Sequence, residues 1–108
     1  MNIALDFDDT YTRDPLMWDC FIDHCHERGH DIRIVTFRYE NFVNTDLERA
    51  IGDKIPVIYC NANKKRGHCA SIGFFPDVWI DDTPEFITAD SYVPGELLAK
   101  NIGYYDKE

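Results

Sequence analysis

Two pairs of carboxylates, each placed directly after a short apolar stretch, are the side chains of this chain best suited to chemistry. Asp6 and Asp8 follow the sequence IAL, and Asp81 and Asp82 follow VWI. Alternate side chains of a strand share one face, so Asp6 and Asp8 are expected to enter the same pocket. Carboxylates held close together repel one another, and a bound divalent cation relieves that repulsion. The two pairs therefore predict a site for a hard cation that is open to a phosphate group.

The elements that must position these carboxylates alternate along the chain between strands and helices. Asp14 and Pro15 mark the start of the first helix, as N-cap and first helical residue, and Gly29 ends it. The expected apolar faces are Leu16, Met17, Cys20, Phe21 and Cys25 in this helix and Val43, Leu47, Ala50 and Ile51 in the second. We predict strands at 2–7, 31–37, 55–60 and 77–81, further helices at about 43–51 and from Lys64 or Lys65 to Gly73, and a last helix at 96–101 with a last short strand at 102–105.

This alternation predicts a single α/β domain spanning residues 1–108, with a Rossmann-like three-layer fold. Strands joined by helices form a parallel sheet covered on both faces, here of four to five strands. Ligands of such sheets lie at the carboxyl ends of strands, where the strand order reverses. Both carboxylate pairs stand at predicted carboxyl ends, so the pattern itself predicts a site there.

Composition and charge exclude several classes of function. The 108 residues include 20 acidic and 11 basic side chains, for a net charge of −9. This balance argues against an extended nucleic-acid face and against binding to an anionic membrane. No apolar run approaches the roughly 20 residues of a membrane helix, and the N-terminus lacks the regions of a signal peptide. We therefore expect a cytoplasmic protein with no membrane partner.

Two interpretations of the cysteines and histidines stay open, because the chain has no CxxC pair. In the first, they are small core residues and polar surface groups. In the second, a zinc ion takes ligands from them, although their spacing is irregular. The residues concerned are Cys20, His24, Cys25, His26, Cys60, His68 and Cys69.

Four short motifs resemble, in order, those of the haloacid dehalogenase-like (HAD) hydrolase superfamily. The first is DFDDT at 6–10, similar to DxDxT, and the second is IVT at 34–36, an apolar strand that ends in Thr or Ser. The third is a lysine at the start of the helix before the last core strand, here Lys64 or Lys65. The fourth is WIDD at 79–82, an apolar strand that ends in two acids. The resemblance implies a sheet in which the first strand lies between the second and the fourth.

The resemblance also implies a Mg²⁺-dependent phosphomonoester hydrolase, in which Asp6 attacks phosphorus and forms an aspartyl-phosphate. Asp8 would protonate the leaving oxygen and then deprotonate the attacking water. Mg²⁺ would be bound by Asp6, Asp81 and the backbone carbonyl of Asp8. Asp82 would lie behind these ligands and hold a metal-bound water or the lysine.

Other residues would bind the phosphate group. Thr36 would donate its hydroxyl to a phosphoryl oxygen, and the lysine would neutralise the developing negative charge. Between the two lysines we favour Lys65, because the short helix before Gly73 fits better from there. Further candidates are Thr10, Arg38 and Lys64 for contact with the substrate and Glu85 for an outer acid of the site.

These residues also have ordinary interpretations. Asp8 with Asp9 could form a turn or a helix cap, Thr36 could be a common strand residue, and residues 64–66 could be a solvated turn. A receiver domain also uses an aspartyl-phosphate, but it needs an Asp after the third strand, where this chain has the sequence CNAN. The receiver interpretation is therefore set aside.

The motifs leave no room for a cap domain, so we expect an open site that the substrate or a second subunit covers. Basic and aromatic residues near the same rim favour a nucleotide, or a terminal phosphate of a nucleic acid, as the substrate. The aromatic residues could instead pack on the edge of the core. The residues concerned are Arg38, Lys64, Lys65, Arg66 and His68, and Tyr11, Phe37 and Tyr39.

Two other functions stay open as alternatives: a non-catalytic domain that binds a phosphorylated ligand or a protein, and a phosphotransferase of the same fold. The chain could be a monomer or a homodimer.

Overall fold

The computed structural model describes residues 1–88, which form an α/β fold around a parallel sheet of four strands. The expected α/β class and parallel sheet are thereby confirmed. Each strand except the last is followed by a helix, and single 3₁₀ turns follow β1 and β4 at Tyr11–Arg13 and Pro84–Phe86. The elements are β1 (Asn2–Leu5), α1 (Pro15–Glu27), β2 (Asp31–Thr36), α2 (Thr45–Ile51), β3 (Val57–Tyr59), α3 (Lys65–Ser71) and β4 (Val78–Ile80).

The strands lie in the order β3-β2-β1-β4, so β1 is central and pairs with both β2 and β4. The expectation that the first strand lies between the second and the fourth is confirmed. The chain extends to one side of β1 through β2 and β3 and then returns to the other side with β4. Strand order therefore reverses at β1, where the carboxyl ends of β1 and β4 lie side by side.

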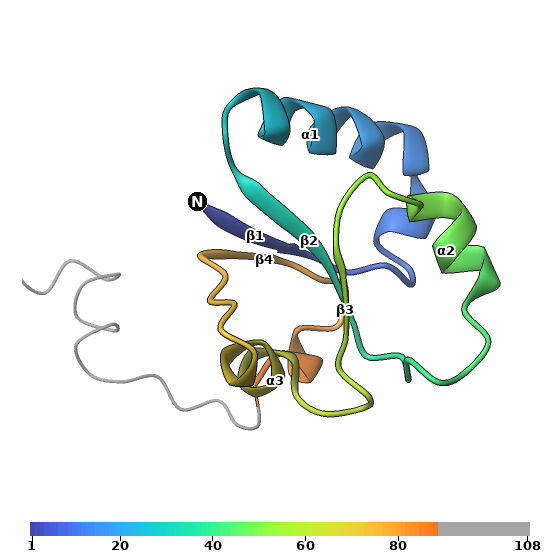
Figure 1. Ribbon diagram of the computed structural model, residues 1–108, viewed down its shortest axis with the longest axis vertical. Coiled ribbons are helices and arrows are strands. Elements are labelled where there is room, and N and C mark those ends of the chain that lie inside the picture. Colours follow the sequence, from blue (N-terminus) through green and yellow to red (C-terminus); the bar gives the residue numbers. More distant parts are fainter. Residues whose placement is uncertain (89–108) are drawn as a thin grey trace, which may run out of the picture.

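The sheet is covered on both faces, which gives three layers (Figure 1). Ile3 and Leu5 of β1 belong to a buried cluster that includes side chains of α1 and α2. Ala4, between them, belongs to a second cluster that includes Cys69 of α3 and Phe74. This alternation is the period of two that a strand imposes on its side chains.

Helix α1 starts and ends as the sequence predicts. The Asp14 side chain accepts a hydrogen bond from the backbone N–H of Met17 at 3.2 Å, and Pro15 is the first helical residue. Gly29, two residues beyond the last helical residue, has a φ of 78°, in the left-handed region that glycine adopts without strain.

The buried face of α1 differs from the predicted one, and this is a correction. Trp18, Phe21, Ile22 and Cys25 pack on the core. Both possible stripes share Phe21 and Cys25, so helical periodicity alone does not distinguish them. The stripe with Trp18 and Ile22 buries more apolar surface and is the one that faces the sheet. The predicted Leu16, Met17 and Cys20 are exposed instead.

Other boundaries are shorter than predicted. Helix α2 begins at Thr45, and Val43 before it is 87% exposed, whereas Leu47 and Ile51 are buried as predicted. Each strand ends one or two residues before its predicted end, and β3 also begins two residues later than predicted. The predicted helix at 96–101 and strand at 102–105, and with them a fifth strand, lie outside the described residues.

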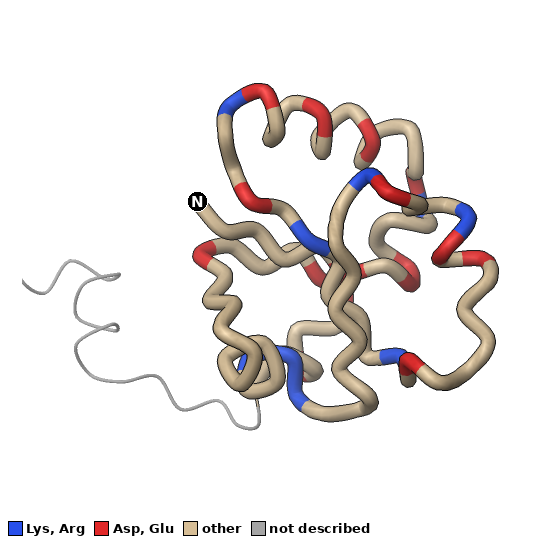
Figure 2. Tube along the Cα trace, viewed as in Figure 1, with Lys and Arg blue, Asp and Glu red and all other residues tan. Residues whose placement is uncertain are grey.

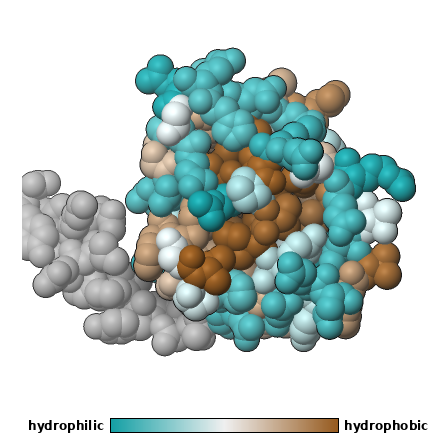
Figure 3. All heavy atoms as spheres, in the orientation of Figure 1, coloured by the Kyte–Doolittle hydropathy of each residue, from teal (hydrophilic) through white to brown (hydrophobic). Residues whose placement is uncertain are grey.

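Hydrophilic side chains cover much of the face shown in Figure 3, with a hydrophobic band across its middle. Within residues 1–88, no helix is long and apolar enough to cross a lipid bilayer. In the same part of the chain the connections are short, and the longest without any helix or strand is 37–44. None of these connections could fold as a separate cap domain.

Candidate active site

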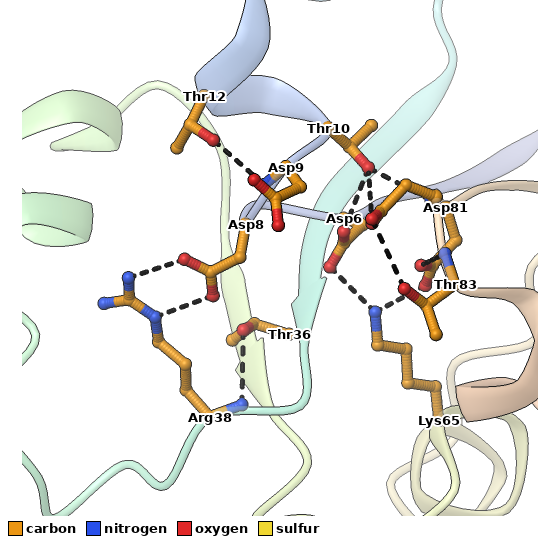
Figure 4. A network of polar contacts seen from close by, with 11 residues as sticks. Asp6, Asp8, Asp9, Thr10, Thr12, Thr36, Arg38, Lys65, Asp81 and Thr83 are labelled. Carbon is orange, nitrogen blue, oxygen red and sulfur yellow. Dashed lines mark hydrogen bonds and ion pairs between the residues drawn. The ribbon is translucent and has the colours of Figure 1, made fainter.

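Asp6 and Asp81 are brought together by the pairing of β1 with β4. The ladder places Leu5 opposite Ile80, and the backbone N–H of Asp6 donates to the carbonyl of Ile80 at 2.9 Å. Each aspartate is the first residue after its strand, so both carboxylates lie at the carboxyl edge of the sheet (Figure 4). This adjacency follows directly from the central position of β1.

Lys65 lies between these two carboxylates. It is the first residue of α3, and its ammonium group donates to Asp6 Oδ1 at 2.8 Å and to Asp81 Oδ2 at 2.5 Å. The side chain is only 1% exposed. Burial alone would lower the pKa of Lys65, but its hydrogen bonds to Asp6 and Asp81 outweigh burial and raise that pKa. The buried lysine is therefore a fixed positive charge at the centre of the site.

Asp6 itself is buried and has an unusual pKa. Burial raises the pKa of Asp6 to about 6, and the neighbouring Lys65 offsets only part of this effect. The hydroxyl of Thr10 donates to Asp6 Oδ2 at 2.9 Å, so each oxygen of Asp6 has a partner. Thr10 also lies 3.2 Å from Asp82 Oδ1 and accepts the Asp82 N–H, which ties the two strand ends together.

Three carboxylates form a group that could hold a metal ion. One oxygen from each of Asp6, Asp81 and Asp82 lies within 4.8 Å of the others, and no further such group of His, Cys, Asp or Glu occurs in residues 1–88. Carboxylate oxygens are the ligands of hard cations such as Mg²⁺ and Ca²⁺, not of soft metals. The hydrogen bond with Asp6 lowers the pKa of Asp82, which keeps that side chain charged.

The side chain of Asp8 does not join this group but pairs with Arg38 instead (Figure 4). Arg38 Nη2 donates to Asp8 Oδ1 at 2.7 Å and Nε donates to Asp8 Oδ2 at 2.9 Å. On its other side the guanidinium makes a second two-bond pair with Asp46, and Nη1 also donates to Asn44 Oδ1. These bonds to Asp46 and Asp8 raise the pKa of Arg38, so the guanidinium is permanently charged.

In the turn after β1 the chain changes direction, so the side chains of Asp6 and Asp8 point to different partners. Asp9 has a φ of 61°, a left-handed conformation that aspartate tolerates better than most residues. Its backbone N–H donates to Thr12 Oγ1 at 2.9 Å, which fixes the turn. The chain then enters the 3₁₀ turn at Tyr11–Arg13.

Thr36 ends β2 close to these groups but is almost fully buried, at 1% exposure. Its hydroxyl accepts the backbone N–H of Arg38 at 3.3 Å, so the hydroxyl hydrogen is still available for an acceptor. The next residue, Phe37, lines the hollow that the carboxylates surround, and Thr36 lies behind it.

The hollow at this edge of the sheet has a volume of about 130 Å³. Five carboxylates line it, together with Phe37, Thr83 and Phe86. Against these five negative charges stand two cations, Lys65 and Arg38. A phosphate dianion would be repelled from such a set unless a further cation were bound. The five lining carboxylates are Asp6, Asp8, Asp9, Asp81 and Asp82.

The structure brings together some of the residues predicted for the site and separates others. Asp6, Thr10, Lys65, Asp81 and Asp82 form one connected network. Asp8 and Arg38 form a neighbouring ion pair, and Thr36 lies behind the hollow. Lys64 points elsewhere and donates to the backbone carbonyl of Glu85 at 2.9 Å. The Glu85 side chain is exposed and outside the carboxylate group.

Two expectations about the rim need correction. Tyr11 cannot stack on a ligand, because it is 2% exposed, stacks on Phe7 and donates its hydroxyl to Asp19. The basic residues do not form one patch: Lys65 is buried between acids, Arg38 is paired with two acids, and Arg66 lines a different hollow. Figure 2 shows Lys and Arg in separate short stretches among Asp and Glu.

The zinc interpretation also fails. Cys20 is exposed whereas Cys25, Cys60 and Cys69 are buried, so the cysteines do not face one site. All four cysteines and all four histidines lie within residues 1–88, and none belongs to a group of three metal-binding side chains there. The cysteines are core or surface residues, which is the simpler of the two interpretations.

Several residues of the site were not predicted from the sequence. Asp46 and Asn44 hold Arg38, and Thr83 donates its backbone N–H to Asp81 Oδ1 at 2.9 Å. Phe86 also lines the hollow. Thr83 directly follows the second acidic pair, so its position in the sequence could have indicated that it belongs to the site. Asp46 gives no such indication, because it resembles any acid in a first helical turn.

Comparisons with protein-family models, with curated proteins and with solved structures found no match to this chain.

Proposed function

We propose that this chain is a Mg²⁺-dependent phosphomonoester hydrolase of the HAD type, with a Rossmann-like fold, that works through an aspartyl-phosphate. The observation that carries the proposal is the position of Lys65, whose buried ammonium contacts Asp6 at the end of β1 and Asp81 at the end of β4. A cation fixed beside a carboxylate nucleophile is what phosphoryl transfer needs, because charge builds up on the phosphoryl oxygens.

The donor set also fits a hard cation. Mg²⁺ would be held by Asp6, Asp81 and the backbone carbonyl of Asp8, with Asp82 beside them, and would screen the nucleophile from the charge of the phosphate. The predominance of carboxylates over cations around the hollow supports this assignment. The carboxylates of Asp6, Asp81 and Asp82 are close enough to share one ion.

In this proposal Asp8 first leaves its ion pair with Arg38 and takes a proton from solvent. Asp6 then attacks phosphorus, the bond from phosphorus to the leaving oxygen breaks, and Asp8 gives its proton to that oxygen. A water molecule then attacks the phosphorus of the aspartyl-phosphate and gives a proton back to Asp8, while the bond from phosphorus to the Asp6 oxygen breaks and releases phosphate and the Asp6 carboxylate. Asp8 is suited to both steps because its side chain is 51% exposed and can reach the solvent side of the hollow. Arg38 stays in place through Asp46 when Asp8 turns to the substrate, so its guanidinium can bind a phosphoryl oxygen.

The test is phosphate release from nucleotides, sugar phosphates and oligonucleotides with a 5′ or 3′ phosphate, with Mg²⁺ and with chelator. We expect metal-dependent release that falls by roughly 1,000-fold or more in Asp6→Asn, because the nucleophile is lost. Asp9→Asn is the matched control, since it removes a neighbouring carboxylate and asparagine tolerates the same left-handed backbone. If both variants lose phosphate release equally, or if Asp6→Asn still releases phosphate, Asp6 is not the nucleophile.

One observation favours a second candidate, a phosphotransferase. Asp8 lines the hollow and its side chain is half exposed, so an alcohol could reach the phosphoryl group as readily as water. Adding candidate alcohols and looking for new phosphoesters separates transfer from hydrolysis. Binding of phosphorylated ligands with neither reaction would instead favour a non-catalytic domain.

A further inference from the structure

Two stacked pairs of aromatic rings lie near the carboxyl edge of the sheet, and they differ in what they face. Phe37 and Phe86 are parallel, with an interplanar angle of 6° and ring centroids 4.2 Å apart. Both line the hollow that contains Asp6, Asp8 and Asp81. Tyr39 and Phe42, with centroids 4.8 Å apart, line a separate hollow beside Arg38. Only the first pair therefore shares a cavity with the carboxylates.

Core packing does not account for the Phe37–Phe86 pair. Neither ring belongs to the two buried clusters that hold the helices on the sheet. Phe86 is 37% exposed, although Phe37 already covers one of its faces. Phe86 therefore presents a partly exposed aromatic surface in the hollow that the carboxylates line, where it can contact an apolar part of a ligand.

The ring of Phe86 is carried by a segment that is fixed relative to the carboxylates. Lys64 Nζ donates to the carbonyl of Glu85 at 2.9 Å, and the backbone N–H of Arg66 donates to the carbonyl of Ile87 at 2.9 Å. These two bonds attach the segment to the start of α3, whose first residue is the site lysine. The ring is thus held in position before any ligand arrives, which reduces the entropy lost on binding.

The size of the hollow decides where a leaving group can lie. Its volume of about 130 Å³ is well below the roughly 300–1,000 Å³ of pockets that enclose a whole ligand. It can take a phosphoryl group, and the rest of the substrate must lie along the rim. The two rings touch face to face, so nothing enters between them, and the free face of Phe86 is the apolar surface that remains at the rim.

We propose that the free face of Phe86 is a subsite for a planar ring in the leaving group of the substrate. This rests on the proposed phosphomonoesterase function and narrows its substrate class to phosphomonoesters that carry such a ring close to the phosphate. The bound ring continues the stack of Phe37 and Phe86 by one layer, at the spacing and offset that aromatic rings favour. Asp6, Asp81 and Asp82 could hold a metal ion that would bind the phosphate group, and Phe86 would contact the planar ring of the leaving group.

The first test compares the kcat/KM of phenyl phosphate and of glycerol phosphate in wild type, Phe86→Ala and Phe86→Tyr. Stacking on one ring contributes about 5- to 30-fold in affinity, so we expect the preference for phenyl phosphate to fall by about that factor in Phe86→Ala. Phe86→Tyr keeps the ring and should keep the preference. Phe42→Ala removes a more exposed ring, at 66% against 37% for Phe86, from the other stacked pair and should leave the ratio unchanged.

The second test measures binding without turnover, by titration calorimetry with phenylphosphonate and methylphosphonate in the presence of Mg²⁺. If phenylphosphonate binds more tightly than methylphosphonate and Phe86→Ala abolishes this difference, the subsite is supported. This holds even if no substrate is hydrolysed and the proposed function fails. Hydrolysis with equal affinity for both phosphonates, or a preference unchanged in Phe86→Ala, overturns the subsite and leaves the hydrolase standing. If Phe42→Ala, and not Phe86→Ala, abolishes the preference for phenylphosphonate, the phenyl ring binds in the hollow beside Arg38. That result also overturns the proposal.

Discussion

At the scale of single residues, the site depends on one buried ammonium group that satisfies two buried carboxylates. The side chains of Lys65, Asp6 and Asp81 are 1%, 8% and 3% exposed. Charges this deeply buried are tolerated only when they are paired and hydrogen-bonded, because desolvation opposes each of them. Loss of Lys65 therefore leaves two uncompensated carboxylates in the interior.

We expect Lys65→Met to lower the free energy of unfolding by about 3 kcal/mol, because two carboxylates lose their only buried cation. Lys64→Met is the matched control: its side chain is exposed and binds one carbonyl, so its cost should stay below about 1 kcal/mol. Urea denaturation of both variants gives the comparison. Similar losses in the two variants would contradict the central role of Lys65 in the network.

The raised pKa of Asp6 predicts a pH dependence of stability for the metal-free protein. The folded pKa is about 6 against 3.8 for the ordinary group. The folded state therefore holds the proton more tightly, and this contribution is fully present below pH 4 and lost as the pH rises through 6. The free energy of unfolding of wild type minus that of Asp6→Asn should fall by up to about 3 kcal/mol between pH 4 and 7. In chelator-treated protein, a difference that is constant or rises with pH would refute the assignment.

At the scale of elements, the loop at 37–44 is shaped by a single buried residue. The Asn44 side chain donates to the carbonyls of Tyr39, Phe42 and Glu40 at 3.0, 3.2 and 3.3 Å, and it accepts from Arg38. Asn44 precedes the first residue of α2, yet its side chain turns back into the loop and does not cap the helix. The loop therefore presents Arg38 in a preset position.

Asn44→Ala should destabilise the protein by about 1–3 kcal/mol, because several loop carbonyls lose their donor in a buried position. It should also speed amide hydrogen exchange across 37–44 more than across the sheet. Asn41→Ala is the control, because it makes the same substitution at an exposed position of the same loop. Unchanged exchange in the loop of Asn44→Ala would show that Asn44 does not hold it.

Much of this arrangement could be predicted from the sequence because it depends on local pattern. Apolar runs, the Asp14-Pro15 start and Gly29 locate the strands and α1, and the two acidic pairs stand at the strand ends as predicted. The partners of Asp8 could not be predicted, since they depend on how the loop at 37–44 folds back. The buried face of α1 could not be predicted either, because two stripes of equal period overlap there.

At the scale of the whole molecule, a net charge of −9 and five carboxylates around one hollow oppose the compact state. A bound divalent cation should therefore stabilise the entire fold and not only the site. Because Mg²⁺ would bind the folded state alone, its effect follows from mass action.

At a Mg²⁺ concentration about 100 times its Kd, the folded state gains about 2.7 kcal/mol, which should raise the Tm by about 10 °C. The increase should vanish in Asp81→Asn, which removes a ligand, and persist in Asp23→Asn, which removes an exposed acid of α1. Thermal scans with and without Mg²⁺ measure it. An equal rise in all three proteins would mean general charge screening and no specific site.

The pairing of β1 with β4 joins residues about 75 positions apart, such as Ile3 and Val78. During synthesis, β1 and β2 leave the ribosome long before β4, so the nascent chain carries Asp6 and Asp8 without Asp81 or the ladder that aligns them. Contacts of such separation form late and slowly, because the chain must first close a long loop. A fragment that stops before β4 would leave one edge of β1 unpaired and exposed to association with other chains. Metal binding would then report that the sheet of residues 1–88 has formed, since the ligand set exists only once β4 has docked.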